Sequence, residues 1–182
     1  MSEGKVLGVV GLGSMGYGAA VSAMKRGVPT WGLDTTEAAR ARFAAAGGQL
    51  AASLQDLASR CDVVQLLVVN AAQTEAVLFG EQGLAATLRP GSVVIASATV
   101  DPALPPQWEA KLAERGLHLI DGPVSGGAKK AAEGQMTVMA SGRPEAFEAA
   151  GSVLDALAGK VYRLGDKAGV GSTVKMVNQH LA

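Results

Sequence analysis

Short runs of valine, isoleucine and leucine alternate with longer segments of mixed polarity over the first two thirds of the chain. The apolar runs predict buried strands, and the mixed segments predict helices. The predicted strands are residues 5–10, 29–33, 49–51, 63–69, 92–96 and 118–121, and the predicted helices are residues 14–26, 36–46, 54–60, 73–79 and 105–115. Apolar strands separated by helices indicate a mostly parallel sheet covered on both faces. We therefore expect a doubly wound α/β domain with a ligand at the carboxyl ends of its strands.

The last third of the chain differs from this pattern. A basic segment framed by glycines spans residues 126–134. Strands are predicted at residues 136–140 and 160–164, and a helix is predicted at residues 144–157. This part therefore lacks the regular alternation of strand and helix that marks the first part.

A final helix is predicted from Ser172, a residue type that is favoured at the N-cap. Its apolar stripe consists of Val174, Val177 and Leu181. The sequence reaches Ala182 without a capping residue, a glycine or a proline, although helices commonly end at one. We therefore expect one domain over residues 1–168 and, over residues 169–182, the start of an interdomain helix that is cut in a longer protein.

The first predicted strand leads directly into Gly11-Leu12-Gly13-Ser14-Met15-Gly16, where the first predicted helix begins. In this context the G-x-G-x-x-G spacing is typical of a Rossmann-type dinucleotide site. Gly11 permits the tight turn, Gly13 lets a pyrophosphate approach the backbone, and Gly16 lets the helix pack closely. The positive end of the helix dipole then faces the pyrophosphate. A turn that binds no nucleotide is the alternative interpretation.

Asp34 directly follows the second predicted strand and lies 23 positions after Gly11. This is close to the roughly 20 positions at which an acidic residue typically binds the adenosine ribose hydroxyls. Thr35, Thr36 and Glu37 follow without an adjacent arginine. A 2′-phosphate would therefore face a carboxylate, a repulsion of about 1–4 kcal/mol at contact distance. The sequence predicts NAD in preference to NADP. The alternative is that Asp34 only caps a helix.

Composition excludes several other classes of function. Hydrophobic residues make up 48% of the 182 positions, which is typical of a globular protein. Sixteen basic and sixteen acidic residues balance, and no basic stretch favours nucleic acid or a membrane surface. The single cysteine, Cys61, excludes an internal disulfide, fits a reducing cytoplasmic location and is expected to be a packed thiol. No cluster of side chains has metal-ligand spacing.

Three further segments follow predicted strands and should lie at the same edge of the sheet. They are Val69-Asn70-Ala71, Ser97-Ala98-Thr99 and the loop from Asp121 to Gly127. The last of these combines a hydroxyl with successive backbone N–H groups, an arrangement that suits a carboxylate. An ordinary glycine- and proline-rich turn is the equally open alternative for this loop.

Lys175 is the best candidate for handling a proton. On the final predicted helix it shares one polar face with Asn178 and Gln179. A hydride transfer between an alcohol and a carbonyl needs a group that accepts or donates the proton of the oxygen, and partial desolvation favours the neutral amine for that task. The alternative is a solvated surface lysine.

Two other catalytic classes fit the residues poorly. Ser172-Thr-Val-Lys175 matches the S-x-x-K pattern of some serine hydrolases, but the S-D-N and K-T-G partner motifs are absent from the sequence. A short-chain dehydrogenase would need Y-x-x-x-K, and neither Tyr17 nor Tyr162 is followed by a lysine at that spacing.

Three segments together resemble the β-hydroxyacid dehydrogenases, a family related to phosphogluconate dehydrogenase. They are GLGSMG at residues 11–16, DGPVSGGAKKAAEGQMTVMASG at residues 121–142 and GVGSTVKMVNQ at residues 169–179. The family includes 3-hydroxyisobutyrate, tartronate semialdehyde and L-threonate dehydrogenases. VNAAQ after the fourth strand and TVMASG look most like the L-threonate dehydrogenase branch.

The resemblance implies a role for each matching position. The implied cofactor-binding residues are Gly11, Leu12, Gly13, Ser14, Met15, Gly16, Asp34, Val69, Asn70 and Thr99. Lys175 would be the catalytic acid and base. The implied substrate-binding residues are Ser125, Gly126, Gly127, Asn178 and Gln179. Many members carry two consecutive asparagines at the last two positions, so Asn178 followed by Gln179 departs from the isobutyrate enzymes.

The resemblance also implies a second, all-helical domain that completes the active site and builds a homo-oligomer. By itself the 182-residue chain would therefore lack half of an active site. Two alternatives stay open: a non-catalytic NAD-binding domain, and an NADPH-dependent reductase of small aldehydes. The lysine-free active site of the related imine reductases disagrees with Lys175.

Overall fold

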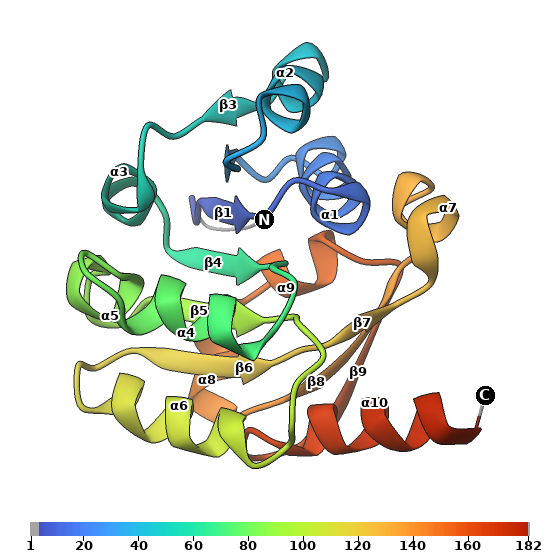
Figure 1. Cartoon of the computed structure of the whole chain (residues 1–182). Coiled ribbons are helices and arrows are strands. Elements are labelled where there is room, and N and C mark those ends of the chain that lie inside the picture. Colours follow the sequence, from blue (N-terminus) through green and yellow to red (C-terminus); the bar gives the residue numbers. More distant parts are fainter. Residues whose placement is uncertain (1–3, 182) are drawn as a thin grey trace.

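The structure is a computed structural model that describes residues 4–181 (Figure 1). Its strands are β1 (Leu7–Val10), β2 (Thr30–Leu33), β3 (Gln49–Leu50), β4 (Val63–Leu66), β5 (Val93–Ala96), β6 (His118–Asp121), β7 (Val124–Ser125), β8 (Thr137–Ser141) and β9 (Lys160–Gly165). Its helices are α1 (Ser14–Lys25), α2 (Glu37–Ala45), α3 (Leu54–Arg60), α4 (Ala71–Phe79), α5 (Leu84–Thr87), α6 (Leu104–Ala113), α7 (Gly127–Ala132), α8 (Pro144–Ala150), α9 (Val153–Ala156) and α10 (Val170–Leu181). Among the described residues no helix is long and apolar enough to cross a bilayer.

The strands form one sheet in the order β3-β2-β1-β4-β5-β6-β8-β7, with β9 paired to β8. The six strands from β3 to β6 are parallel. Strand β8 runs antiparallel to β6 and β7, and β9 runs parallel to β8. The predicted doubly wound, mostly parallel Rossmann-type sheet is confirmed, and its last third turns back antiparallel where the regular alternation of the sequence ends.

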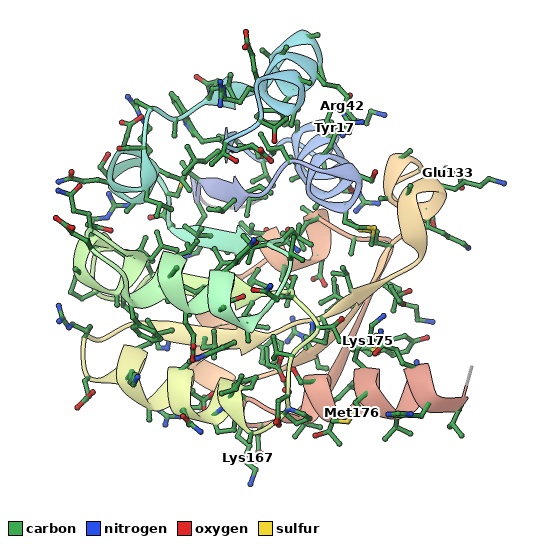
Figure 2. The ribbon with its side chains drawn as sticks, viewed as in Figure 1. Tyr17, Arg42, Glu133, Lys167, Lys175 and Met176 are labelled. Carbon is green, nitrogen blue, oxygen red and sulfur yellow. The ribbon has the colours of Figure 1, made fainter. Side chains whose placement is uncertain are left out.

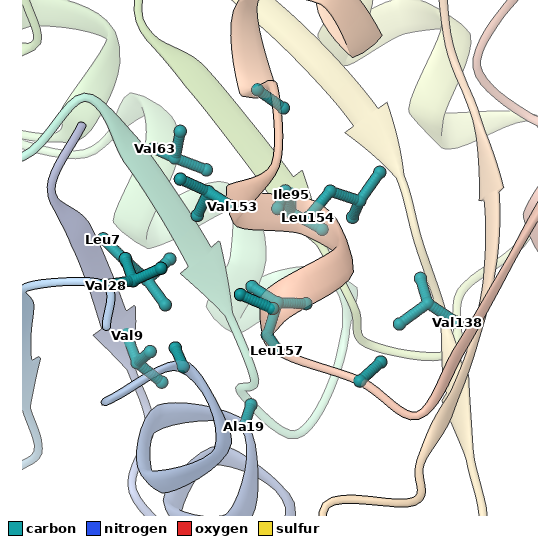
Figure 3. Close-up of a cluster of buried hydrophobic side chains, with 14 of the residues drawn as sticks. Leu7, Val9, Ala19, Val28, Val63, Ile95, Val138, Val153, Leu154 and Leu157 are labelled. Carbon is teal, nitrogen blue, oxygen red and sulfur yellow. The ribbon is translucent and has the colours of Figure 1, made fainter. Parts of the chain in front are cut away.

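Helices cover both faces of the sheet, as continuous apolar strands require. Residues of β1 alternate between the two resulting cores. Leu7 and Val9 pack with α1, α8 and α9, and Figure 3 shows this core around Val153, Leu154 and Leu157. Val10 belongs to the opposite core, which α3 to α6 close and in which Trp108 is fully buried.

The predicted strand at residues 63–69 is longer than the observed β4, which ends at Leu66. Its neighbour β1 ends at Val10 because the chain turns away at Gly11. The hydrogen bond from Leu67 N–H to the Val10 carbonyl, at 2.8 Å, closes the pairing of the two strands. The apolar sequence continues past this point without a boundary signal. Val69 therefore leaves the sheet and is 79% exposed at its carboxyl edge.

The antiparallel part holds two further differences from the sequence prediction. The predicted helix at residues 144–157 is broken into α8 and α9 by Gly151, whose φ of +57° a right-handed helix does not allow. The basic segment at residues 126–134 contains the short helix α7. That helix packs against α1 so closely that a Cβ at Gly18 would collide with the Ala131 backbone.

The start of the final helix corrects the predicted cap. Helix α10 begins at Val170, so Ser172 lies inside its first turn. Its amides are capped by a residue remote in sequence, because the N–H groups of Gly169 and Ser172 both donate to the carboxylate of Asp121. The predicted apolar stripe is largely uncovered, with Val177 51% and Leu181 80% exposed. Ala182 lies outside the described residues.

Candidate functional site at the carboxyl edge of the sheet

The chain leaves β1 and β4, two neighbouring strands, toward opposite sides of the sheet. This arrangement is the topological switch point at which open α/β sheets bind ligands. Gly11 turns the chain there with a φ of +96°, and its N–H donates to the Leu33 carbonyl at 2.9 Å. A Cβ at Gly11 would collide with the Leu67 carbonyl of the loop after β4. The two loops therefore meet so closely that only glycine fits.

The other two motif glycines have different surroundings. A Cβ at Gly16 would collide with the Gly11 carbonyl oxygen, so close packing of α1 on the turn requires glycine. A Cβ at Gly13 would meet no described atom within 4 Å, and its φ of −66° suits any residue. Packing within the described chain therefore does not explain Gly13, whereas close approach of a dinucleotide pyrophosphate does. No side chain caps α1, which leaves its first amides facing the same space.

Asp34 follows β2 and ties the glycine turn to that strand. Its carboxylate accepts from the Leu12 N–H and from the Thr36 N–H, both at 2.7 Å. Burial raises the pKa of Asp34, but these hydrogen bonds and the Arg40 guanidinium outweigh burial and hold it below its ordinary value. The side chain is therefore an ionised acceptor beside the turn, which suits ribose hydroxyls and disfavours a phosphate.

Two arginines near Asp34 escaped the sequence prediction, which considered only the adjacent positions. Arg40 donates to the Asp34 carbonyl at 2.9 Å. Arg42 stacks on the Tyr17 ring at 4.2 Å and donates to the Leu12 carbonyl at 3.4 Å, and Figure 2 shows this pair between α1 and α2. Both lie on α2, the helix that follows Asp34. A search of the first two turns of the predicted helix at residues 36–46 could have found them.

Val69, Asn70 and Thr99 also lie at the carboxyl edge, after β4 and β5. Asn70 caps α4, with its side-chain oxygen accepting from Gln73 N–H at 2.9 Å. The Gln73 side chain in turn accepts from Val69 N–H at 3.0 Å. These two hydrogen bonds fix the loop that carries Val69. Thr99 is exposed in the loop that follows β5.

The glycine-rich loop joins β7 to α7 and needs its glycines. Gly126 and Gly127 have φ of +125° and +69°, which L side chains rarely adopt. A Cβ at Gly126 would also approach the Lys130 Cβ at 2.8 Å, whereas one at Gly127 would meet nothing within 4 Å. Ser125 ends β7 just before this turn and is half-buried. The hydroxyl and the amides that follow it therefore lie at the start of α7.

The structure brings this loop together with the polar face of α10. Ser125, Lys175, Asn178, Gln179 and Leu181 line one open hollow with a volume of ≈ 410 Å³. In Figure 2 Lys175 lies on the side of α10 that faces β7, and Met176 lies on the opposite side. Lys175 is half-buried, and the Asn178 amide lies 3.9 Å from the Met139 sulfur. Residues separated by about 50 positions in the sequence thus share one hollow that has room for a small acid.

Other reactive side chains lie apart from this hollow. Cys61 is fully buried, and burial raises the pKa of its thiol to about 12, which makes it a poor nucleophile. Among residues 4–181 no group of three or more histidine, cysteine, aspartate or glutamate side chains could hold a metal ion.

Comparison with known proteins places this geometry in a family. Residues 6–165 match the family described as the NAD binding domain of 6-phosphogluconate dehydrogenase. The chain is 54% identical to an L-threonate dehydrogenase of Cupriavidus necator and 32% identical to an NAD-dependent L-serine dehydrogenase of Pseudomonas aeruginosa. Each match covers 97% of this chain and 59% of the relative, so the chain spans under two thirds of the length of either.

A solved structure has the same fold. The crystal structure described as 3-hydroxyisobutyrate dehydrogenase from Salmonella typhimurium superimposes with a TM-score of 0.91 at 48% identity. The match covers 97% of this chain and 62% of that structure's chain. On the family match over most of its length and on the glycine turn described above, the chain belongs to the family of NAD-binding domains found in 6-phosphogluconate dehydrogenase.

Proposed function

We propose that the chain is the N-terminal NAD-binding domain of a dehydrogenase that acts on a small β-hydroxy acid of the L-threonate type. The hollow shared by Ser125 and Lys175 carries this proposal. It offers a carboxylate site and a basic group at the same edge of the sheet as the glycine turn. The 54% identity to an L-threonate dehydrogenase supports this substrate class over 3-hydroxyisobutyrate and tartronate semialdehyde.

The cofactor residues have separate tasks in this proposal. The amides after Gly11 hold the pyrophosphate, with Gly13 leaving room for it. The ionised Asp34 accepts from the ribose hydroxyls, which favours NAD over NADP. Val69, Asn70 and Thr99 border the nicotinamide half. Bound NAD supplies the hydride acceptor.

The substrate residues orient one carbon for that transfer. The Ser125 hydroxyl and the amides of Gly126 and Gly127 hold the substrate carboxylate. Asn178 and Gln179 donate to further hydroxyls of the substrate. In the oxidative direction Lys175 Nζ accepts the hydroxyl proton as the hydride leaves the same carbon, and in reduction it returns that proton. Fixing both ends of the substrate brings the hydroxyl to Lys175, which is catalysis by orientation.

The first experiment measures cofactor binding to the 182-residue chain by nicotinamide fluorescence. Tighter binding of NADH than of NADPH is expected because Asp34 is ionised. Tighter NADPH binding would favour the alternative of an NADPH-dependent aldehyde reductase. Absence of binding by either would overturn the cofactor site in this chain.

The second experiment tests the lysine in the complete dehydrogenase. Lys175→Ala should lower kcat with L-threonate by about 100-fold or more, the usual weight of a general base, with NADH affinity unchanged. Lys167→Ala is the matched control, because Lys167 is exposed and points away from the hollow in Figure 2. Equal effects of both substitutions would contradict the role of Lys175, and wild-type protein without turnover would favour a non-catalytic NAD-binding domain.

The complete protein is further proposed to be a cytoplasmic homo-oligomer. The one cysteine of the 182-residue chain, Cys61, is buried and free, which agrees with a reducing compartment. The uncovered apolar side chains of Val177 and Leu181 agree with burial against further protein.

A further inference from the structure

The two halves of the proposed substrate site meet at one buried carboxylate. Asp121 is the last residue of β6 and is 1% exposed. Its Oδ2 accepts from Gly169 N–H at 3.0 Å and from Ser172 N–H at 2.8 Å, and its Oδ1 accepts from the Ser172 hydroxyl at 2.6 Å. One side chain of the sheet thus binds three donors at the start of α10.

A neighbouring serine also holds the start of α10, and together with Asp121 it forms what we call the anchor. Ser141, at the end of β8, accepts from Gly171 N–H at 2.8 Å and also hydrogen-bonds the Asp121 carboxylate. A Cβ at Gly171 would collide with the Met139 carbonyl and come within 2.8 Å of the Asp121 carbonyl. The first turn of α10 is therefore pressed onto β6 and β8 and cannot slide without breaking these bonds.

The contact between Asp121 and Ser172 lies close in sequence to both halves of the proposed substrate site. Ser125 follows Asp121 after only Gly122, Pro123 and Val124, and Lys175 follows Ser172 by less than one helical turn. The short connection is itself held, because Met139 N–H donates to the Pro123 carbonyl at 2.9 Å. The separation of Ser125 and Lys175 therefore depends on the contact between Asp121 and Ser172.

A carboxylate is a costly way to cap a helix. Burial raises the pKa of Asp121, and the bonds from Ser172, Gly169 and Ser141 offset this effect only in part. A local serine or asparagine would cap the helix without a buried charge. Holding two segments about 50 residues apart in one register is a task that a local cap cannot perform.

We propose that Asp121, acting through Ser172 and Ser141, is a positioning residue that sets Lys175 against the Ser125 loop. This inference rests on the proposed dehydrogenase function of that site. Asp121 itself touches no reacting group, since it is buried beneath the first turn of α10.

The test compares two buried hydroxyls. Ser172→Ala removes the 2.6 Å bond to Asp121, and Thr30→Val removes the bond of Thr30 to the Val28 carbonyl (2.9 Å), far from the hollow. In the complete dehydrogenase Ser172→Ala should lower kcat about tenfold, because misplacement of a catalytic group by a fraction of an ångström costs rate, with KM for NAD unchanged. Thr30→Val should leave kcat unchanged while lowering the melting temperature comparably.

A second measurement needs no turnover. Spin labels are attached to A128C on α7 and Q179C on α10, both exposed positions, and the buried Cys61 does not compete for label. The distribution of distances between the labels should broaden with Ser172→Ala and with Ser141→Ala, and stay as in the parent with Thr30→Val. Asp121→Asn should broaden it most.

The outcomes separate this inference from the proposed function. An inactive wild type with broadened distances in Ser172→Ala would remove the dehydrogenase function and leave the anchor. An active wild type whose kcat and distances resist both serine substitutions would overturn the positioning role alone. Equal loss of kcat in Ser172→Ala and Thr30→Val would also overturn it, because the effect would then follow stability.

Discussion

The cofactor edge and the substrate hollow are built in opposite ways. The part of the cofactor edge proposed to hold the pyrophosphate depends on residues close in sequence, since strand β1, the glycine turn and α1 follow one another within residues 7–25. The hollow depends on residues about 50 positions apart, joined through Asp121 and Ser172. A local motif can be read as a unit, whereas a site assembled by tertiary contacts takes its geometry from bonds that no short segment contains.

The largest expected effect is a break in the local turn itself. Gly16→Ala places a methyl group against the Gly11 carbonyl, so the turn and α1 must separate. We expect a loss of about 1–3 kcal/mol in the free energy of unfolding, typical of overpacking, together with loss of NADH binding. Urea unfolding and the fluorescence titration measure the two effects. Unchanged stability would show that the close contact of Gly16 with the turn is dispensable.

A gentler change in the same motif should separate binding from folding. Gly13→Ala meets no described atom within 4 Å at an ordinary φ, so stability should change by less than about 0.5 kcal/mol. NADH affinity should nevertheless fall by about tenfold, roughly 1.4 kcal/mol, because the methyl group occupies the approach of the pyrophosphate. An unchanged dissociation constant would contradict the role of Gly13, and Gly16→Ala serves as the unstable counterpart.

The smallest expected effect is the change in the contribution of Asp34 to stability at acidic pH. Its folded-state pKa lies below its ordinary value of 3.8, so its contribution to stability is present above 3.8 and is lost as the pH falls through the folded-state pKa. Asp34→Asn removes this contribution. The gap in melting temperature between wild type and variant should be constant near neutral pH and shrink below about pH 4. A gap that persists at pH 2 would show that the variant is destabilised by altered packing or hydrogen bonding at residue 34, and not by loss of the negative charge.

The contrast explains how far the sequence could be interpreted. Helix α3 and strand β6 were predicted with their observed bounds, since polar caps and apolar runs mark both ends. The glycine turn and Asp34 were likewise found from local spacing. The end of β4 at Leu66 was missed because the turn of a neighbouring strand, rather than its own sequence, ends it.

The cap of α10 shows the limit most clearly. Serine is a common N-cap residue, but in the structure the Ser172 hydroxyl donates to the Asp121 carboxylate. Asp121 was noticed only as part of the glycine-rich loop, because nothing in its local sequence connects it to residue 172. The roles of Ser125 and Lys175 stay predictions, although the structure places them in one hollow.

The close contact of Gly18 with Ala131 has a consequence for anyone who wishes to retarget this protein. Helix α7 begins at the loop proposed to hold the substrate, and α1 begins at the turn proposed to hold the cofactor. The backbones of α1 and α7 are in contact at Gly18 and Ala131. A substrate loop taken from a relative will therefore fit only if the helix that follows it can pack equally closely against α1 at Gly18. Substrate range and cofactor helix are therefore expected to change together, and libraries that vary one should vary the other.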